Sequence, residues 1–493
     1  MKTKKNLVPK NLWRRAYALY KEMSKIPRGS GNTEAIKEWL ISFAKNHRLE
    51  YKTYKGNMMI YGRGWNGSAK IALQGHMDMV NAYDTSVYEM MPPITLQKTK
   101  GWCHGKGTSI GADNGLGLAF GLAILTSRKA RILPIAVLAT RDEETGMFGA
   151  KEVAKETDWL DEEVTYFINL DSEDLGTIYN GCAGGRKITW SLPVSRSTAV
   201  GSMLNIKLTG LKGGHSGVNI GDSYNAIHLL GETLSGAYHS QPFWLRDIRG
   251  GQFNVEGGPV VNVIPKDASA TVVVDTDKLD GFMSTLEMLR ATLVNKYGGM
   301  EPNIDLSFEL VSPDDAVDMN CITMDRSRSI IDHLSNAPTG LQRMFENGQV
   351  KTSLNLSNIQ TTEDSVILNF SIRSSENCEM EALVKKLLSV GDGDFSEDAN
   401  FSFPAWEPKE ASELADKAKT VFERMFGYAP KVETIHGGLE VAIFFSQHPE
   451  IEYISVGPTI LYVHTDKERF CISDAVKFAK FLWYFVFELT TAA

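Results

Sequence analysis

The chain has 493 residues, of which 43% are hydrophobic, 10% aromatic and 23% charged. This length accommodates two or three domains, and the composition excludes a mainly disordered or collagen-like protein. The 52 basic and 60 acidic residues give a formal net charge of −8. Nucleic-acid-binding proteins usually carry a basic excess, so no nucleic-acid partner is expected.

Two amphipathic helices are predicted near the start of the chain, over residues 11–24 and 33–46, because apolar residues recur there every three or four positions. Short apolar runs follow, with helical stretches between them. The predicted strands include 58–61, 71–73, 132–138 and 166–168, and the predicted helices include 114–127 and 148–157. The last three strands are almost continuously apolar, as buried parallel strands are, so this region predicts a three-layer α/β domain.

The pattern changes from about residue 188, where alternating apolar and polar residues predict an antiparallel α+β region. Its predicted strands are 204–208, 260–264, 270–274, 304–308 and 366–372, and its predicted helices are 222–236, 278–296 and 376–390. Residues 391–410 are acidic and contain Gly and Pro, which favours a linker. Helices and strands then alternate again, and a final helix is predicted over about 470–489.

The sequence predicts a cytoplasmic protein with no membrane partner. No segment reaches the 18 or so apolar residues that span a bilayer, and the apolar run 481–487 suits a core helix. The basic start of the chain lacks the apolar stretch of a signal peptide. Five cysteines without a C-x-x-C pair fit a reducing compartment and argue against a thiolate zinc site.

Side chains that commonly bind metals follow three of the predicted strands. Because ligands bind at the carboxyl ends of the strands in an open α/β sheet, these side chains are expected to converge. A further carboxylate opens a predicted helix and would point into the same crevice. Strand by strand, the residues are His76 and Asp78, then Glu143 and Glu144, then Asp171, and the helix adds Asp113.

Taken one at a time, these residues have ordinary structural explanations. A lone histidine is more often hydrogen-bonded or solvated than metal-bound, adjacent glutamates are usually surface charge, and an Asp-Asn pair often caps a helix. Taken together, one histidine and three carboxylates at one end of a sheet would form a negative pocket that is costly without a cation. Carboxylate and imidazole ligands suit zinc, manganese or cobalt.

Four segments, in this order, resemble the M20 family of co-catalytic zinc metallopeptidases: 75–78 (GHMD), 111–115 (GADNG), 142–146 (DEETG) and 169–173 (NLDSE). Four more are similar to its aminoacyl-histidine (Xaa-His) dipeptidase, or carnosinase-like, branch: 179–185 (YNGCAGG), 211–217 (LKGGHSG), 352–355 (TSLN) and 436–440 (HGGLE). The similarity runs from about residue 24 to the C-terminus.

The resemblance implies two divalent metal ions per chain, zinc first, with manganese and cobalt as alternatives. Their ligands would be divided as follows: His76 and Asp171 on one ion, Glu144 and His464 on the other, and Asp113 on both. Asp78 would orient the imidazole of His76, as metal-bound histidines generally require. Glu143 would be the general base that takes a proton from the attacking water and returns it to the leaving amine.

The resemblance also implies how the chain is divided. A catalytic zinc-peptidase-like domain would comprise residues 1–187 and 400–493, because His464 comes only after the second region. Residues 188–399 would form an inserted α+β lid or dimerisation domain, and the protein would be a homodimer. Whether His215 acts within one subunit or across two stays open.

Four residues are expected to contact a short peptide substrate. His215 would reach the carbonyl oxyanion, although without the resemblance an exposed turn histidine is the simpler explanation. Asn262 and Arg373 would bind the substrate's C-terminal carboxylate, a task that suits the planar guanidinium; a surface charge is the alternative for Arg373. Glu440 would accept the free amino group, which is the weakest of these hypotheses.

The expected activity is hydrolysis of the peptide bond of Xaa-His dipeptides such as β-Ala-His. A broader dipeptidase or tripeptidase and an N-acyl amino acid deacylase are alternatives. A non-catalytic scaffold is disfavoured because Glu143 stands beside a complete ligand set. A nucleotide-binding protein is disfavoured because no G-x-G-x-x-G follows a predicted strand.

Overall fold

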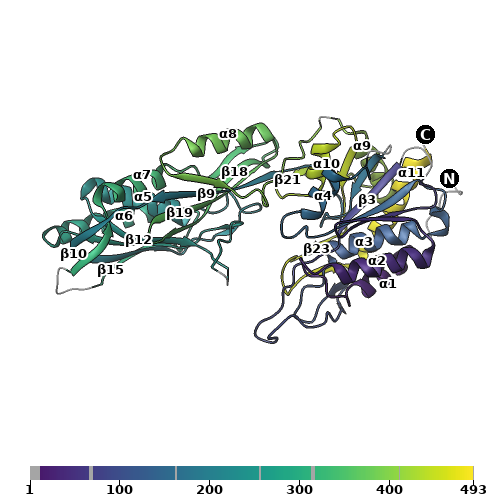
Figure 1. Ribbon diagram of the computed structural model, residues 1–493, viewed down its shortest axis with the longest axis horizontal. Coiled ribbons are helices and arrows are strands. Elements are labelled where there is room, and N and C mark those ends of the chain that lie inside the picture. The colour runs from purple at the N-terminus through teal and green to yellow at the C-terminus, as the bar shows by residue number, and fades with distance from the viewer. Residues whose placement is uncertain are drawn as a thin grey trace. The chain divides into compact units, whose positions relative to one another are not determined.

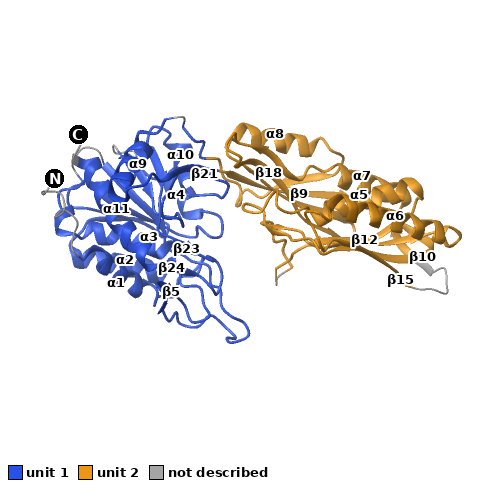
Figure 2. Cartoon of the chain, turned by 180° about the vertical axis from the view of Figure 1, so that it is seen from behind, with its two compact units in different colours: residues 1–182, 406–493 blue, residues 183–405 orange. Residues whose placement is uncertain are grey.

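The computed structural model describes residues 11–65, 70–160, 164–254, 257–311, 317–409 and 411–491. The chain divides into two compact units, one of residues 1–182 and 406–493 and the other of residues 183–405 (Figure 2). Unit 1 is therefore discontinuous in sequence, and unit 2 is one continuous segment.

Unit 1 is built on an eight-stranded sheet in the order β1-β2-β6-β3-β7-β22-β8-β21. Its centre is parallel, because β3 pairs in parallel with both β6 and β7, and β7 pairs in parallel with β22. The strands are β1 (Tyr51–Tyr54), β2 (Asn57–Tyr61), β3 (Lys70–His76), β6 (Ile135–Thr140), β7 (Val164–Asn169), β8 (Thr177–Cys182), β21 (Lys431–Ile435) and β22 (Glu452–Ser455). β6 is buried along its whole length and β3 along nearly all of it, as continuously apolar strands require.

Helices cover both faces of this sheet (Figure 1). On one face, five helices share a hydrophobic core with residues such as Ile71 and Leu73 of β3; they are α1 (Leu12–Met23), α2 (Glu34–His47), α3 (Ala112–Leu125), α9 (Glu413–Phe426) and α11 (Ile472–Thr491). On the other, Phe167 of β7 contacts Phe444 of α10 (Val441–Gln447) with ring centroids 4.9 Å apart, and α10 packs on α4 (Phe148–Glu156). The predicted three-layer α/β architecture is confirmed.

A small sheet in the order β23-β24-β5-β4 adjoins these layers within unit 1. Its strands are β4 (Gln97–Thr99), β5 (Trp102–His104), β23 (Ile460–Leu461) and β24 (Arg469–Cys471). The loop between β23 and β24 carries His464. Because β24 pairs with β5, this sheet places the His464 loop beside residues 102–104.

Unit 2 is built on an antiparallel sheet of ten strands in the order β15-β10-β14-β12-β18-β19-β9-β20, with β16 beside β10 and β17 beside β18. The strands are β9 (Gly184–Pro193), β10 (Arg196–Thr209), β12 (Trp244–Gly251), β14 (Ala268–Val274), β15 (Asp305–Leu310), β16 (Val317–Ile322), β17 (Gly340–Met344), β18 (Val350–Thr361), β19 (Ser365–Ser374) and β20 (Asp394–Glu397). The helices α5 (Ala226–Ser240), α6 (Leu279–Tyr297), α7 (Met324–Asn336) and α8 (Asn377–Leu388) pack against it in one core. The predicted α+β class is confirmed.

The prediction of a linker over residues 391–410 is wrong. Within this segment, β20 pairs with β9 and closes one edge of the sheet of unit 2. Phe395 stacks on Trp190 of β9 with ring centroids 4.9 Å apart, and the indole Nε1 donates to the carbonyl oxygen of Asp392 at 2.8 Å. The segment is acidic and contains glycine, but Phe395 provides an aromatic contact with the sheet, and such a contact helps to hold an edge strand.

Two predicted elements are displaced, each for a local reason. The strand expected at 132–138 begins at Ile135, since Pro134 precedes it and Ile132 is 80% exposed. The helix expected from 222 begins at Ala226, because the side chain of Asn225 accepts hydrogen bonds from the amides of Ile227 and His228 and caps it.

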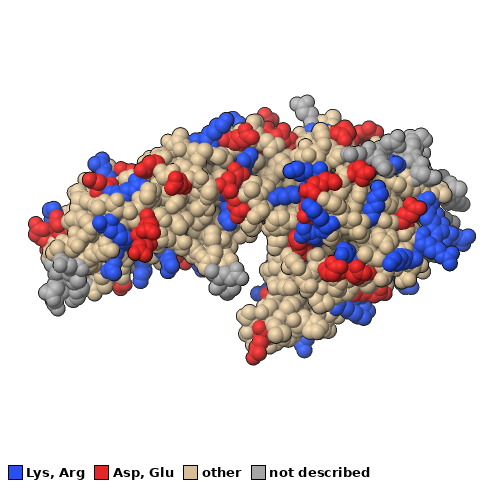
Figure 3. Space-filling view, in the orientation of Figure 1, with Lys and Arg blue, Asp and Glu red and all other residues tan. Residues whose placement is uncertain are grey.

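Among the described residues, no helix combines the length and the apolar character needed to cross a membrane. On the face drawn in Figure 3, acidic and basic side chains are intermingled over most of the surface.

Candidate active site

The candidate site lies at the carboxyl ends of the central parallel strands of unit 1. His76 is the last residue of β3, Glu143 and Glu144 lie in the loop after β6, and Asp171 follows β7 by two residues. Asp113 stands in the first turn of α3, which packs on β3 and β6. Parallel strands end at one edge of a sheet, so the fold gathers side chains that are widely separated in sequence.

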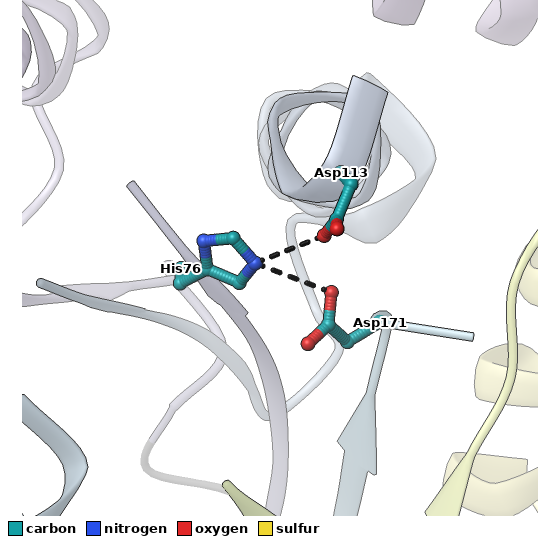
Figure 4. A group of neighbouring side chains, drawn as sticks. All are labelled: His76, Asp113 and Asp171. Atoms are coloured by element: carbon teal, nitrogen blue, oxygen red, sulfur yellow. Dashed lines mark hydrogen bonds and ion pairs between the residues drawn. The ribbon is translucent and has the colours of Figure 1, made fainter. Parts of the chain in front are cut away.

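One cluster of potential ligands comprises His76, Asp113 and Asp171 (Figure 4). The Nε2 atom of His76 lies 3.0 Å from Asp113 Oδ1 and 3.5 Å from Asp171 Oδ1. The imidazole is buried, with 1% of its surface exposed, and its Nε2 edge points at the two carboxylates. An imidazole nitrogen and two carboxylate oxygens converge here.

A second cluster comprises His464, Asp113 and Glu144. The Nε2 atom of His464 lies 3.1 Å from Asp113 Oδ2 and 2.8 Å from Glu144 Oε2. Asp113 therefore turns one carboxylate oxygen toward each histidine and belongs to both clusters. A third group of nearby ligand atoms joins His76, Glu143 and Glu144.

The donor set fits divalent cations. Glu144 Oε1 and Asp171 Oδ1 are buried and accept no hydrogen bond from any residue that the structure describes. An unsatisfied buried carboxylate oxygen is costly. Four carboxylates and two imidazoles lie in one small region, which is the donor chemistry that zinc, manganese and cobalt prefer. Cations would supply the charge compensation that the surrounding side chains leave incomplete.

The side chain of Asp78 is fully buried behind His76 and connects two loops. Its Oδ1 atom lies 3.4 Å from His76 Nδ1, on the opposite side of the ring from the clusters. The same carboxylate accepts hydrogen bonds from the hydroxyl of Ser30 at 2.8 Å and from the amides of Glu143 at 3.1 Å and Glu144 at 3.3 Å. Asp78 thus lies against the imidazole and connects the loop after β6 to β3.

The charges of the site shift the pKa values of both histidines upward. Burial alone would lower the pKa of His76, but the carboxylates of Asp171, Asp113 and Asp78 outweigh it and hold that pKa well above its usual value. Burial also lowers the pKa of His464, but hydrogen bonds to Asp113 and Glu144 outweigh it and raise that pKa to about 11.

Crowding of the carboxylates shifts their pKa values as well. Burial raises the pKa of Glu143 well above its usual value, and the negative charges of Glu144 and Asp171 add to that effect. Burial, and then Asp113, raises the pKa of Glu144, and the same two causes raise that of Asp171. Asp113 behaves differently, because hydrogen bonds from His464 and His76 overcome its burial and lower its pKa.

Glu440, which is expected to accept the substrate's amino group, lies in a buried part of unit 1. Its side chain is fully buried, and its Oε2 atom accepts hydrogen bonds from Thr140 Oγ1 at 2.6 Å and from the side-chain amide of Gln74. Burial raises its pKa to about 8. Its Oε2 atom is thus held within a buried polar cluster of unit 1, and a contact with the substrate's amino group stays a prediction.

His215, Asn262 and Arg373 all lie in unit 2, and the structure brings them together there. β11 (Gly214–His215) pairs with β13 (Val263–Ile264), and the carbonyl oxygen of Asn262 accepts from the amide of Ser216 at 2.8 Å. A methyl group at Gly217 would lie 3.2 Å from His215 Cε1 and 3.5 Å from Arg373 Cζ. The imidazole and the guanidinium therefore flank the same glycine.

Two buried residues of the site were missed by sequence reasoning. Glu468 accepts hydrogen bonds from the backbone at the start of α3. Arg28 donates to the carbonyl oxygens of Met77 at 2.7 Å and Asp78 at 2.9 Å. The only signal for Glu468 was its position four residues after His464, and nothing in the local pattern marks Arg28.

A family model described as peptidase family M20/M25/M40 matches residues 72–488 of the chain. The chain belongs to this family. Residues 72–488 include every residue of the two ligand clusters, from His76 to His464. Membership makes the protein a metallopeptidase, and hence a hydrolase, as the resemblance had implied.

Relatives with assigned activities are similar to this M20/M25/M40 peptidase over almost its full length. It is 33% identical over 477 residues to the cytosol non-specific dipeptidase of Escherichia coli (strain K12). The aligned region covers 94% of this chain and 94% of that one. The crystal structure of aminoacylhistidine dipeptidase from Vibrio alginolyticus matches with a TM-score of 0.82 and 29% identity, over 98% of this chain and 97% of that one. Aminopeptidase PepT from Bacillus cereus shares the fold, with a TM-score of 0.54 and 15% identity over 97% and 98% of the two chains.

Proposed function

We propose that this protein is a two-metal dipeptidase that cleaves the peptide bond of Xaa-His dipeptides such as β-Ala-His. The observation that carries the proposal is the placement of Asp113, whose two carboxylate oxygens face His76 and His464 separately at 3.0 and 3.1 Å. A carboxylate shared in this way is the bridge that a pair of cations requires. Two of the three relatives described above, those from Escherichia coli and Vibrio alginolyticus, are named as dipeptidases.

The proposed ligands follow from the two clusters. His76 and Asp171 would hold one ion, Glu144 and His464 the other, and Asp113 both; zinc is the first candidate, with manganese and cobalt as alternatives. A bound pair of divalent ions would polarise the scissile carbonyl and lower the pKa of a water between them. Asp78, on the far side of the His76 ring, would keep Nε2 directed at its ion.

Glu143 is the proposed general base. It belongs to a group of nearby ligand atoms with His76 and Glu144 but to neither of the clusters that contain Asp113. Its carboxylate would take the proton of the attacking water and deliver it to the leaving amine.

Unit 2 would supply the groups that bind the rest of the substrate. The imidazole of His215 would stabilise the oxyanion, and Asn262 and Arg373 would bind the C-terminal carboxylate, for which a guanidinium is well shaped. We propose that unit 2 serves as a lid or dimerisation domain, that the protein works as a homodimer, and that it acts in the cytoplasm, as the name of the Escherichia coli relative says of that protein.

A broader dipeptidase is the second candidate, because the Escherichia coli relative is named as a non-specific dipeptidase. Turnover of β-Ala-His, Gly-Leu, a tripeptide and N-acetylornithine, with metal analysis before and after chelation, tests both candidates. We expect dipeptide cleavage that is lost on chelation and restored by zinc. Preference for β-Ala-His supports the first candidate, equal cleavage of Gly-Leu supports the second, and deacetylation without dipeptide cleavage contradicts both.

A further inference from the structure

The backbone at the start of α3 is held by one carboxylate from a distant part of the chain. The amides of Ile110 and Gly111 donate to Glu468 Oε2 at 2.7 and 3.0 Å, and those of Ala112 and Asp113 donate to Glu468 Oε1 at 2.7 and 3.3 Å. Four consecutive amides thus share one side chain. Glu468 is 2% exposed, so no solvent competes for these bonds.

The carbonyl groups of the same segment are also held by buried side chains. Tyr20 donates from its hydroxyl to the carbonyl oxygen of Ile110 at 2.8 Å, and Arg28 donates from Nη2 to that of Gly111 at 2.5 Å. Gly111 has a φ of 57°, and a methyl group there would lie 2.3 Å from Arg28 Nη2. The segment that delivers Asp113 is therefore fixed from both sides, with little room to shift.

Glu468 also belongs to the loop that carries His464. Tyr462 and His464 both have positive φ angles, 57° and 61°, a conformation that side chains other than glycine adopt only at a cost. The loop closes on itself, because Thr465 Oγ1 donates to the carbonyl oxygen of Tyr462 at 2.7 Å and the amide of Glu468 donates to that of Thr465 at 3.2 Å. Glu468 then anchors this closed loop to residues 110–113.

We propose that Glu468 is a positioning residue for the metal pair, because its carboxylate fixes the Asp113 and His464 loops against each other. This inference rests on the proposed function, in which Asp113 and His464 are metal ligands. It explains how His464 Nε2 comes to lie 3.1 Å from Asp113 Oδ2 although 351 positions separate them.

The side-chain type matters for this role. A carboxylate offers about four lone-pair sites and no donor, which matches four converging N–H groups. A glutamine keeps the size but presents an NH₂ group to two of those amides, so at least two buried donors lose their partner. Glu468→Gln therefore tests the contact with little change in volume.

The experiment compares the wild-type protein with Glu468→Gln and with the control Glu452→Gln. Glu452 begins β22 in the same unit, at the opposite end of the sheet from the site, and accepts hydrogen bonds from Lys409 at 2.8 Å and Ser412 at 3.0 Å. Amide hydrogen exchange of residues 110–113 is measured in the metal-free full-length chain. Zinc affinity and β-Ala-His turnover are then measured on the same preparations.

For Glu468→Gln we expect exchange at 110–113 to accelerate about tenfold or more, and zinc affinity and kcat each to fall about 10–100-fold. Glu452→Gln should leave all three at wild-type values. Glu468→Asp keeps the charge on a shorter side chain and should restore part of the zinc affinity. If Glu468→Gln does not fold, Glu468→Asp takes its place in the same comparison, with accelerated exchange and weaker zinc binding expected.

The outcomes separate this inference from the proposed function. Faster exchange with unchanged zinc affinity and turnover would overturn the positioning role, and so would wild-type behaviour in all three measurements. A wild-type protein that binds no zinc and cleaves no dipeptide would overturn the proposed function, and this inference with it. An active wild-type enzyme with an unaffected Glu468→Gln variant would overturn the inference alone.

Discussion

At the scale of single residues, the acidic side chains of the site differ in what they contact. Asp113 faces both histidines, Asp78 supports one ring from behind, and Glu440 lies in a buried polar cluster with Thr140. Glu143 belongs to neither cluster that contains Asp113. Removing each carboxylate should therefore affect metal binding and turnover in different proportions.

Glu143→Gln should lower turnover and leave metal binding intact. The amide cannot accept the proton of the attacking water, so we expect kcat to fall by roughly 10²–10⁴-fold. Zinc occupancy should stay close to wild type, because the proposed ligands are intact. Turnover of β-Ala-His and metal analysis of the same sample check this, and unchanged turnover would remove Glu143 from the mechanism.

Glu440 should make the stability of the metal-free protein depend on pH. Its pKa is raised to about 8 by burial, so the folded state keeps a proton that the unfolded state releases above its ordinary pKa. Rising pH therefore favours unfolding between the ordinary glutamate pKa and about pH 8. Over this range the equilibrium constant for unfolding rises by at most about tenfold per pH unit. Glu440→Gln resembles the protonated form and should weaken this dependence.

Denaturant unfolding of the metal-free wild type, Glu440→Gln and Glu413→Gln at pH 5.5 and 8 measures the effect. Glu413 is an exposed residue of α9, so its variant should follow the wild type. Parallel pH dependence in all three proteins would show that Glu440 does not titrate in this window.

At the scale of elements, the ends of the parallel strands could be predicted from the sequence, whereas edge strands could not. β3, β6 and β7 each contain an apolar run of three or more residues, and that composition indicates a buried parallel strand. β20 is four residues long, mostly polar and next to glycines. Its pairing depends on the stacking of Phe395 on Trp190, a contact between residues about 200 positions apart.

Phe395→Ala should therefore destabilise unit 2. Loss of a half-buried aromatic contact is expected to cost about 1–3 kcal/mol in the free energy of unfolding. Phe401→Ala removes a ring of the same type that is 44% exposed and should change stability by less than about 0.5 kcal/mol. Chemical denaturation measures both, and equal small effects would mean that β20 is not held by this ring.

At the scale of the whole molecule, the two units have separate hydrophobic cores with no residue in common. The chain leaves and re-enters unit 1 at paired positions, because the amide of Cys182 donates to the carbonyl oxygen of Trp406 at 2.9 Å and the reverse bond is 3.1 Å. Unit 1 contains both ligand clusters, and unit 2 contains His215 and Arg373.

A chain in which a short Gly/Ser linker replaces residues 183–405 should fold and bind zinc with the stoichiometry of the full protein. Its ends already meet at Cys182 and Trp406, so closing them adds little entropy cost. Turnover of β-Ala-His should fall by at least about 10²–10³-fold, the usual cost of losing an oxyanion donor. Full activity of the shortened chain would contradict the roles proposed for His215 and Arg373.

The sequence by itself determined the architecture of both units and the residue types of the site. Hydrophobic periodicity and apolar runs are local properties, and side chains at the ends of parallel strands must share one edge of a sheet. The resemblance to M20 peptidases then supplied His464, whose role no local pattern indicates.

Only the tertiary structure decided which buried groups support those ligands. Glu468 and Asp113 are 355 positions apart, Arg28 and Gly111 are 83 apart, and Glu440 and Gln74 are 366 apart. A charged residue is expected on the surface until a partner is known, and such partners come from distant segments that only packing brings together. The same reason accounts for the burial of Glu440 and the pairing of β20, since both depend on contacts that neighbouring residues do not encode.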